Sequence, residues 1–378
     1  MKKGLQVLAL LIGILVPLST SPWAPVETAV AAPNTVIHCS SATRVVQDGV
    51  ITQGEYSGSY FDTTTKVLVY FDCEGTTNRT LHVAMVSPWK GWVGLLLQAS
   101  EVWNGDMNVV RVSLGEGITP AFFDGYLNST SGRELEDVQQ GGTNDVHHLA
   151  AVRTDEITVY EFALPLSSSD TYDSQLSGNG PFYFQLEYNA FDVGLQSNAT
   201  GVSLPQTIET RPNHSHGEWS NLELSLSVKD NPSIETQILL VLRNLTGFPV
   251  SYAPLQVFVR TAFGFMDLGL VVTNAQGVAE VVYAPRGAGK YLVGAAFEGR
   301  DGVLASVGWV TLIVDTPNAA LPLMHSDNIA LSLVFLGVGG VWVAYGYALL
   351  LGYLATNRPA KDFEFLDTRG PRRGRWER

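Results

Sequence analysis

Two histidines and a glutamate alternate in one short stretch of the chain and could together bind a metal ion. His214, His216 and Glu218 are spaced two residues apart, so on an extended strand their side chains would all point to one side. Two imidazoles and a carboxylate suit zinc or copper. Because Pro212 lies beside the stretch, an exposed linker is the alternative interpretation.

The chain has only two cysteines, Cys39 and Cys73, and these could form a disulfide. Such a bridge would close a loop of about 35 residues and stabilise the fold by ~3 kcal/mol in the chain-entropy model. It requires an oxidising compartment, and two free thiols are the alternative. Sequons that could be glycosylated in an exported glycoprotein occur at Asn78, Asn128, Asn198, Asn213 and Asn244.

The motifs of several common enzyme classes are missing from the sequence. It contains no Gly-x-Ser-x-Gly elbow, Walker loop, His-Glu-x-x-His pair or Cys-x-x-Cys pair. Its many acidic residues lie in turn-like stretches without the spacing of a calcium-binding loop. We therefore predict that the protein is not an enzyme.

Both ends of the chain predict export and anchoring in a membrane. Residues 1–32 combine two lysines, an apolar run and an Ala-Val-Ala pattern, which is typical of a signal peptide. Residues 329–355 carry no charge and are long enough to cross a hydrocarbon core of ~30 Å as a helix. A short stalk at 317–328 precedes this predicted transmembrane helix.

The distribution of charge predicts the orientation in the cell membrane. Residues 33–328 carry 14 basic and 31 acidic side chains, a net charge of −17, whereas the tail at 356–378 carries 7 basic and 4 acidic ones, a net charge of +3. The positive-inside rule places the basic tail in the cytoplasm and the acidic body outside. An acidic body also excludes nucleic acid as an expected partner, because phosphate binding needs a basic face.

The body of the protein is predicted to be all-β, with one sandwich at 33–229 and a second β-domain at 230–316. Short runs rich in Val, Tyr, Phe and Thr alternate with Gly, Asn, Asp and Ser, and no apolar period of 3.6 residues is sustained before residue 329. The clearest predicted strands are 66–72, 80–86, 92–99, 108–114, 156–164 and 181–189 in the first domain and 238–242, 255–259, 278–283, 291–297 and 309–314 in the second.

Four stretches of the first domain, in order, resemble the extracellular DOMON domains. They are Asp48–Ile51 followed by Glu55-Tyr56, the run Val86–Gly94 ending in Gly-Trp-Val-Gly, the run Gly141–Asp145, and Tyr160–Leu166 followed by Asp170. The resemblance covers residues 40–205. It implies an immunoglobulin-like sandwich that binds haem b or a sugar outside the membrane.

Haem binding is the first kind of site that this resemblance implies. Haem-binding members of the family hold the iron with a Met just after the Gly-Trp-Val-Gly strand and usually a His near the last strand. The present sequence has Trp103 in the Met position and no His between residues 188 and 205. Met107 with His147 or His148 would have to supply the axial ligands instead.

Sugar binding is the second kind of site that the resemblance implies. Aromatic side chains can stack on sugar rings or on other apolar ligands. Packing in the core or at the rim of a sandwich is the alternative for such residues. The candidates are Trp89, Trp92, Trp103 and Tyr126.

The second domain has two stretches, Thr273–Ala279 and Gly287–Val293, that resemble bacterial immunoglobulin-like surface domains. This resemblance implies a spacer or adhesion role. The predicted fold class is therefore all-β, with two immunoglobulin-like β-sandwich domains followed by one C-terminal transmembrane helix.

A stripe of small side chains runs along the predicted transmembrane helix, at Gly340, Ala344, Ala348 and Gly352. Small residues at four-residue spacing let helix backbones approach closely in lipid. We therefore predict that the helix pairs with a copy of itself or with another membrane subunit.

The function predicted from the sequence is that of a single-pass, membrane-anchored binding or scaffolding protein. Its DOMON-like domain would be presented outside the cell on an immunoglobulin-like spacer and would bind a ligand, carbohydrate being one class. The alternative prediction is a haem b electron-transfer protein at the same face of the membrane.

Overall fold

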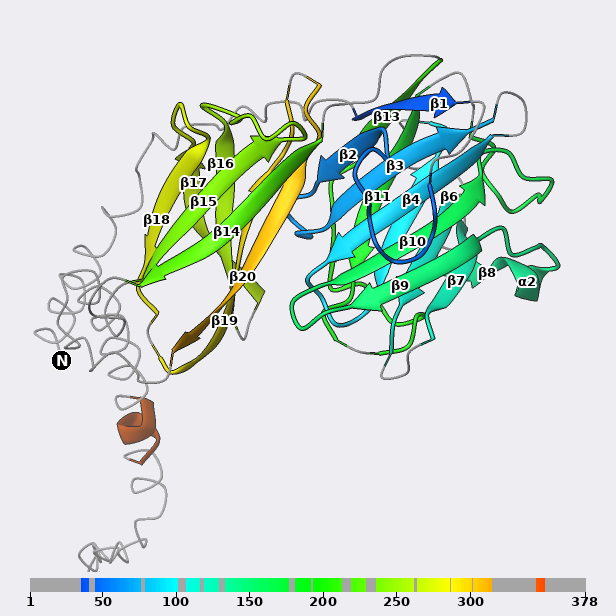
Figure 1. Ribbon diagram of the computed structural model, residues 1–378. Helices are drawn as coiled ribbons and strands as arrows, with labels where there is room; N and C mark the ends of the chain where they lie inside the picture. Colours follow the sequence, from blue (N-terminus) through cyan, green and yellow to red (C-terminus); the bar gives the residue numbers. More distant parts are fainter. Residues whose placement is uncertain are drawn as a thin grey trace, which may run out of the picture. The chain divides into compact units, whose positions relative to one another are not determined.

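Strands account for most of the described chain in the computed structural model (Figure 1). Both β-sandwiches belong to one compact unit, Met1–Ala284 with Gly289–Ile313, and the remaining residues form a second unit. The structure describes residues 35–40, 45–75, 79–100, 107–115, 119–128, 133–176, 181–191, 193–212, 219–228, 236–261, 264–285, 287–300, 302–314 and 345–350.

The first sandwich is built from thirteen strands and one short helix. In chain order they are β1 Thr35–Ser40, β2 Gly58–Phe61, β3 Leu68–Glu74, β4 Thr80–Ser87, β5 Val93–Gln98, β6 Met107–Ser113, β7 Ala121–Asn128, β8 Arg133–Glu136, α2 Asp137–Gln140, β9 His147–Arg153, β10 Thr158–Pro165, β11 Phe182–Tyr188, β12 Gly201–Val202 and β13 Gln206–Pro212.

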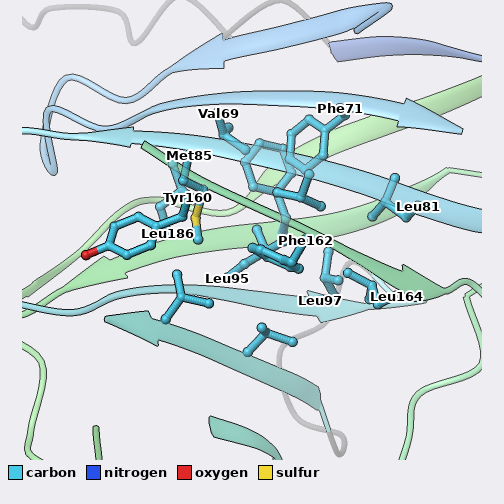
Figure 2. Packing of buried hydrophobic residues seen from close by; sticks show 14 of the residues in the cluster. Val69, Phe71, Leu81, Met85, Leu95, Leu97, Tyr160, Phe162, Leu164 and Leu186 are labelled. Carbon is cyan, nitrogen blue, oxygen red and sulfur yellow. The ribbon is translucent and has the colours of Figure 1, made fainter. Parts of the chain in front are cut away.

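The strands of this sandwich form one continuous hydrogen-bonded path that folds into two layers. The order is β8-β7-β6-β5-β11-β13-β1-β3-β4-β10-β9, with β12 added to β11 and β2 added to β3. Residues from the two halves of the path share one buried core, in which β3, β4 and β10 face β5, β6 and β11 (Figure 2). Every second residue points into this core, as in Leu81, Val83 and Met85 of β4, which is the period of a strand.

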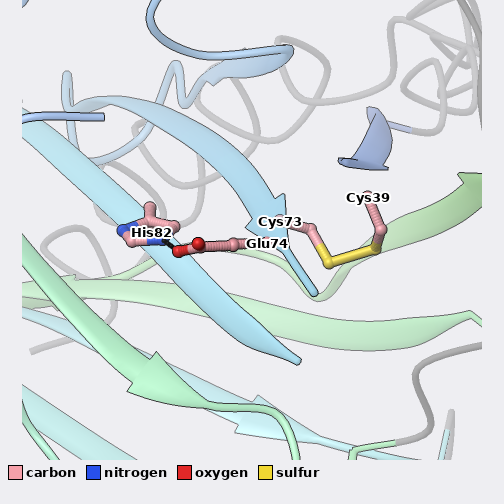
Figure 3. The surroundings of a disulfide bond; sticks show 4 residues. All are labelled: Cys39, Cys73, Glu74 and His82. Atoms are coloured by element: carbon pink, nitrogen blue, oxygen red, sulfur yellow. Dashed lines mark hydrogen bonds and ion pairs between the residues drawn. A yellow bond between two sulfur atoms is a disulfide. The ribbon is translucent and has the colours of Figure 1, made fainter. Parts of the chain in front are cut away.

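Strand β1 connects the two layers. Its first part pairs in parallel with β13, and its last two residues pair in parallel with β3. Cys39 lies opposite Cys73 in the latter register, and a disulfide joins the two (Figure 3). The pairing expected from the sequence is therefore present. Beside it, Glu74 is hydrogen-bonded to Nε2 of His82 at 3.2 Å.

The second sandwich has seven strands in two sheets. A three-stranded sheet has the order β14-β15-β18 and a four-stranded sheet the order β17-β16-β19-β20. In an immunoglobulin constant-type domain the fourth strand pairs with the fifth; here the fourth strand, β17, pairs with the third, β16, instead. The bounds are β14 Ser220–Val228, β15 Thr236–Asn244, β16 Pro254–Thr261, β17 Gly264–Val272, β18 Val278–Tyr283, β19 Gly289–Phe297 and β20 Ser306–Val314.

The domain boundary differs from the one expected at residues 229/230. All nine residues of β14, which precedes that point, pair with β15 of the second sandwich. Alternating Leu and Ser residues in β14 would fit either sandwich, because the pattern defines a strand but not its partner. The boundary therefore lies between β13 and β14.

The predicted membrane segment falls almost wholly outside the described residues. Within the part of the chain that the structure describes, no helix has the length and apolarity needed to span a bilayer. Residues 345–350, in the second half of the predicted span, are helical. The signal peptide, the stalk and the basic tail also lie outside the described residues, so these assignments stay predictions.

Candidate functional site

An aromatic interface joins the first sandwich to the second. The rings of Phe61 and Phe258 stack with their centroids 5.9 Å apart and their planes at 10°. Tyr70 and Trp219 stack at 5.2 Å and 7°. These rings belong to one buried cluster that includes residues of both sandwiches. The outer face of the β3–β4 sheet is thus covered by the second domain, which explains why nearly every residue of both strands is buried.

A cleft of about 380 Å³ opens beside this interface, and both sandwiches contribute to its walls. Its lining combines aromatic and aliphatic side chains with hydroxyl and amide groups. The lining residues are Ile51, Gln53, Leu68, Tyr70, Val86, Ile157, Trp219, Ser220, Asn221, Leu222, Ser306, Val307 and Trp309.

The two tryptophans of the cleft differ in how their indole N–H groups are satisfied. Nε1 of Trp219 donates to the carbonyl oxygen of Tyr56 at 3.2 Å. Nε1 of Trp309 is buried and has no hydrogen-bond partner among the residues that the structure describes. A buried donor without an acceptor is costly in free energy. The indole N–H of Trp309 is therefore an unsatisfied donor in the wall of the cleft, with almost no exposed surface of its own.

The aromatic candidates of the first sandwich are packed against the protein's own side chains. Trp89 is 5% exposed and stacks on Tyr188 at 4.2 Å. Trp92 is fully buried, and Tyr126, 6% exposed, stacks on Tyr172 at 5.0 Å. Their faces are already covered, so the packing alternative describes all three. Trp103 lies outside the described residues.

The haem candidates are not brought together. Met107 is 4% exposed in a small apolar cluster with Leu96, Val109 and Phe123. His147 and His148, by contrast, are exposed on β9 with their rings 6.4 Å apart. β9 lies at the opposite end of the strand order from β6–β8. A buried thioether and exposed imidazoles on separate strands do not form the two converging ligands that a haem iron requires.

Only some of the other candidate residues lie in the part of the chain that the structure describes. His214, His216 and Glu218 lie outside the described residues, as do the sequons at Asn78 and Asn213. Of the remaining sequons, Asn198 is exposed, whereas Asn128 and Asn244 are half-buried. Of the four small residues of the predicted transmembrane helix, Ala348 lies in the helical segment at 345–350. The other three, Gly340, Ala344 and Gly352, lie outside the described residues.

A buried ion pair lies beneath the Gly-Trp-Val-Gly stretch and was not anticipated from the sequence. Nε of Arg111 on β6 donates to Oε1 of Glu187 on β11 at 2.5 Å, and the guanidinium lies 4.2 Å from the ring of Trp92. Burial raises the pKa of Glu187, and Arg111 opposes that rise. A Cβ at Gly94 would lie 2.6 Å from Oε1 of Glu187, so this motif glycine makes room for the pair.

Five aspartates gather at the crossover from β8 to β9. Asp124 is on β7, Asp137 begins α2, Asp145 follows α2, and Asp170 and Asp173 are in the loop after β10. The pKa of Asp124 is raised to about 6, that of Asp137 to about 7 and that of Asp173 to about 8, chiefly by burial and in part by the charges of neighbouring acids. These five residues are far apart in the sequence, and nothing in their spacing indicates that they meet. The one sequence signal for the cluster is that Asp145 and Asp170 both belong to the DOMON-like stretches.

Comparison with known proteins gives no family assignment. No model of a protein family matches the chain, and no curated protein sequence does. Three solved structures that match are the human OSCAR ligand-binding domain, the D00-D0 domain of intimin and the tetra-tandem repeat in the extending region of a large adhesion protein. Their sequence identities are 12%, 15% and 12%, and their TM-scores 0.19, 0.18 and 0.22.

These matches cover 62%, 58% and 66% of this chain and 89%, 98% and 81% of the respective structures. At such TM-scores the likeness says nothing about what this chain binds. The functional argument therefore rests on the residues of the site.

Proposed function

We propose that this chain is an extracytoplasmic binding protein, anchored by one membrane helix at 329–355, whose cleft between the two sandwiches takes a carbohydrate. The first sandwich is its DOMON-like part, and the second sandwich is the immunoglobulin-like spacer on which it is presented. A disulfide between Cys39 and Cys73 supports an oxidising location outside the cytoplasm.

The observation that carries this proposal is the lining of the cleft. Sugar rings are recognised by an aromatic surface together with a few fixed hydrogen-bonding groups. The lining includes Trp219, which stacks on Tyr70, and Trp309, which packs edge-on against Phe258. The hydroxyl of Ser220 already donates to the carbonyl of Leu304 at 2.7 Å, whereas the indole N–H of Trp309 has no acceptor among the described residues. Because β14 and β20 supply half of this lining, the spacer is also part of the binding site.

A glycan array probed with the full-length chain in detergent tests the proposal. Trp309→Phe keeps an aromatic ring in the cleft but removes the N–H, so it should weaken glycan binding about threefold to tenfold. Trp92→Phe is the matched control, since Nε1 of Trp92 donates to Ser197 within the first sandwich. Equal loss in both variants, or no glycan binding by the folded wild type, would contradict the cleft as a carbohydrate site.

The absorption spectrum of the same preparation separates this function from haem-based electron transfer. We expect no Soret band, because Met107 and the two exposed histidines of β9 do not converge. A Soret band that disappears in Met107→Ala would instead establish the haem alternative.

A further inference from the structure

We propose that the aspartates at the β8–β9 crossover form a calcium site, with Asp137, Asp170 and Asp173 as its direct ligands. Each of the three offers a carboxylate oxygen, and these oxygens all lie within 4.8 Å of one another. Calcium binds oxygen at 2.3–2.6 Å, so two oxygens up to roughly twice that distance apart can share one ion. The spacing therefore fits a single calcium ion.

The environment of Asp137 is evidence for a bound ion that does not depend on how many acids lie nearby. Its side chain is 0% exposed, and neither Oδ1 nor Oδ2 has a hydrogen-bond partner among the described residues. A buried carboxylate without donors is among the most costly groups to place in a fold. A cation at this position would compensate the charge and occupy both oxygens.

Two more buried carboxylate oxygens of the cluster also lack a donor. Oδ2 of Asp173 and Oδ2 of Asp145 are each buried and have no donor in the part of the chain that the structure describes, and the two carboxyl groups interact directly. No basic side chain is among the charged groups that shift the pKa of Asp124, Asp137 or Asp173.

The backbone around the cluster is arranged to hold these carboxylates in place. Oδ2 of Asp170 accepts from the backbone N–H of Thr143 at 2.5 Å, and Oδ1 accepts from that of Tyr172 at 2.9 Å. A Cβ at Gly142 would lie 2.2 Å from Oδ2 of Asp170, so any larger residue there would displace this carboxylate from its present position. The hydroxyl of Tyr172 donates to the carbonyl of Gln140 at 2.9 Å, which ties the loop after β10 to α2.

The donor set favours calcium among the common metal ions. All candidate ligands are carboxylate oxygens, whereas zinc and copper prefer imidazole or thiolate. Magnesium demands a near-ideal octahedron and keeps several waters, while calcium accepts irregular sites built from several carboxylates. An ion held here would join the β8–α2–β9 crossover, which connects the two edge strands of the sandwich, to the loop between β10 and β11.

Calcium titration of the EDTA-treated, full-length chain in detergent tests this site, with heat of binding and thermal unfolding as readouts. We expect saturable binding with a Kd of roughly 1 mM or tighter and a rise in Tm of roughly 2–5 °C at saturation. Asp137→Asn should weaken calcium binding at least about tenfold, because affinity follows the number of charged ligands. Asp155→Asn, at an exposed acid elsewhere, should bind as the wild type does.

The stability of the metal-free protein is a second readout. It distinguishes a calcium ligand at Asp137 from a side chain that only stabilises the fold, because loss of the latter would destabilise the protein without calcium as well. Without calcium, Asp137→Asn should be at least as stable as the wild type, because it removes a buried carboxyl group that has no hydrogen-bond donor among the described residues. Unchanged calcium affinity in Asp137→Asn, tighter binding of magnesium than of calcium, or no binding by the folded wild type would each overturn the proposal. None of these results depends on whether the cleft binds a glycan.

Discussion

Lys66 of the first sandwich donates from Nζ to Oδ1 of Asp267 of the second at a distance of 2.9 Å, and the same ammonium lies 4.8 Å from the ring centroid of Phe258. The two partners differ in their surroundings, since the side chain of Lys66 is 5% exposed and that of Asp267 is 58% exposed. The ion pair therefore joins a charge buried in one sandwich to a hydrated charge on the other.

This asymmetry predicts that the two partners respond differently to substitution. Asp267→Asn leaves the buried ammonium without its closest carboxylate and should lower the free energy of unfolding by about 1–3 kcal/mol. Lys66→Met leaves Asp267 accessible to water and removes a favourable charge near Glu298, and it should cost less than about 1 kcal/mol. Urea unfolding of the full-length chain measures both changes, with Asp155→Asn as a surface control. A larger effect of Lys66→Met than of Asp267→Asn would contradict the interpretation.

The Cys39–Cys73 disulfide should contribute ~3 kcal/mol to stability, because it closes a long loop in the unfolded chain. Unfolding in urea with and without reductant measures the contribution. The Cys39→Ala/Cys73→Ala double variant supplies the control: it should match the reduced wild type and should not respond to reductant. If the oxidised wild type and the double variant unfold at the same urea concentration, the bridge does not stabilise the fold.

The buried pair of Tyr56 and Glu161 predicts a pH-dependent loss of stability. The hydroxyl of Tyr56 donates to Oε1 of Glu161 at 2.7 Å, while Oε2 accepts from the backbone N–H groups of Gly49 at 2.6 Å and Asp48 at 3.1 Å. Burial raises the pKa of Glu161, the Tyr56 hydroxyl lowers it, and the charge of Glu55 raises it. Tyr56→Phe leaves Oε1 without a donor and should cost about 1–3 kcal/mol at neutral pH.

The sign of the pH effect follows from the direction of this shift. A carboxyl group with a raised pKa in the fold favours the native state while it is protonated, and that contribution is lost as the pH rises through the folded-state pKa. Removing the Tyr56 hydroxyl raises the pKa further, so the difference from the wild type should grow from acidic to neutral pH. Tyr60→Phe is the control, because the hydroxyl of Tyr60 is 3.5 Å from Asp62 in a partly exposed position. A loss that is independent of pH would contradict this account.

Strands could be predicted best from the sequence where one face of the strand meets the core and most of its residues are β-branched or aromatic. The predicted strand at 80–86 corresponds to β4, and those at 66–72 and 278–283 correspond to β3 and β18. β7 was missed because Asp124 and Gly125 interrupt its apolar pattern, and β9 was missed because it is an edge strand with mostly exposed side chains.

The candidate site was less predictable, because its parts come from distant segments. Nothing local indicates that β1 pairs with β13, or that the face of β3 and β4 that carries Tyr70 would be covered by the second sandwich. For the same reason, Trp89 and Trp92 could be assigned to ligand binding from the sequence although the structure buries both. The aspartates at the β8–β9 crossover meet only through tertiary folding, so their sequence spacing shows no metal-binding pattern.

The small-residue stripe of the predicted membrane helix leads to a prediction about assembly. Replacing Ala344 and Ala348 by Leu should prevent close approach of two helix backbones and weaken their association. A membrane two-hybrid assay measures this association. Leu substitution at Val341 and Tyr345, outside the stripe, is the matched control and should have little effect. Association that survives the Ala344→Leu/Ala348→Leu change would reduce the helix to a simple anchor.

The first glycine of the Gly-Trp-Val-Gly stretch is predicted to be irreplaceable for a steric reason. A Cβ at Gly91 would lie 2.1 Å from the carbonyl oxygen of Phe191 and 2.3 Å from that of Asn189, and both contacts are with backbone atoms that cannot rotate away. Asn189 is itself fixed, because its backbone N–H donates to the carbonyl of Trp92 at 2.8 Å and its side chain donates to Asn198 at 2.8 Å.

Gly91→Ala should therefore separate the β4–β5 connection from the segment after β11 and lower the free energy of unfolding by about 2–4 kcal/mol, as expected for a severe overpacking clash. Gly115→Ala is the matched control: a Cβ there meets nothing within 4 Å, so stability should change by less than about 0.5 kcal/mol. Urea unfolding of the two variants measures the difference. Equal stability of Gly91→Ala and Gly115→Ala would show that the segment after β11 can move away from the Gly-Trp-Val-Gly stretch at little cost.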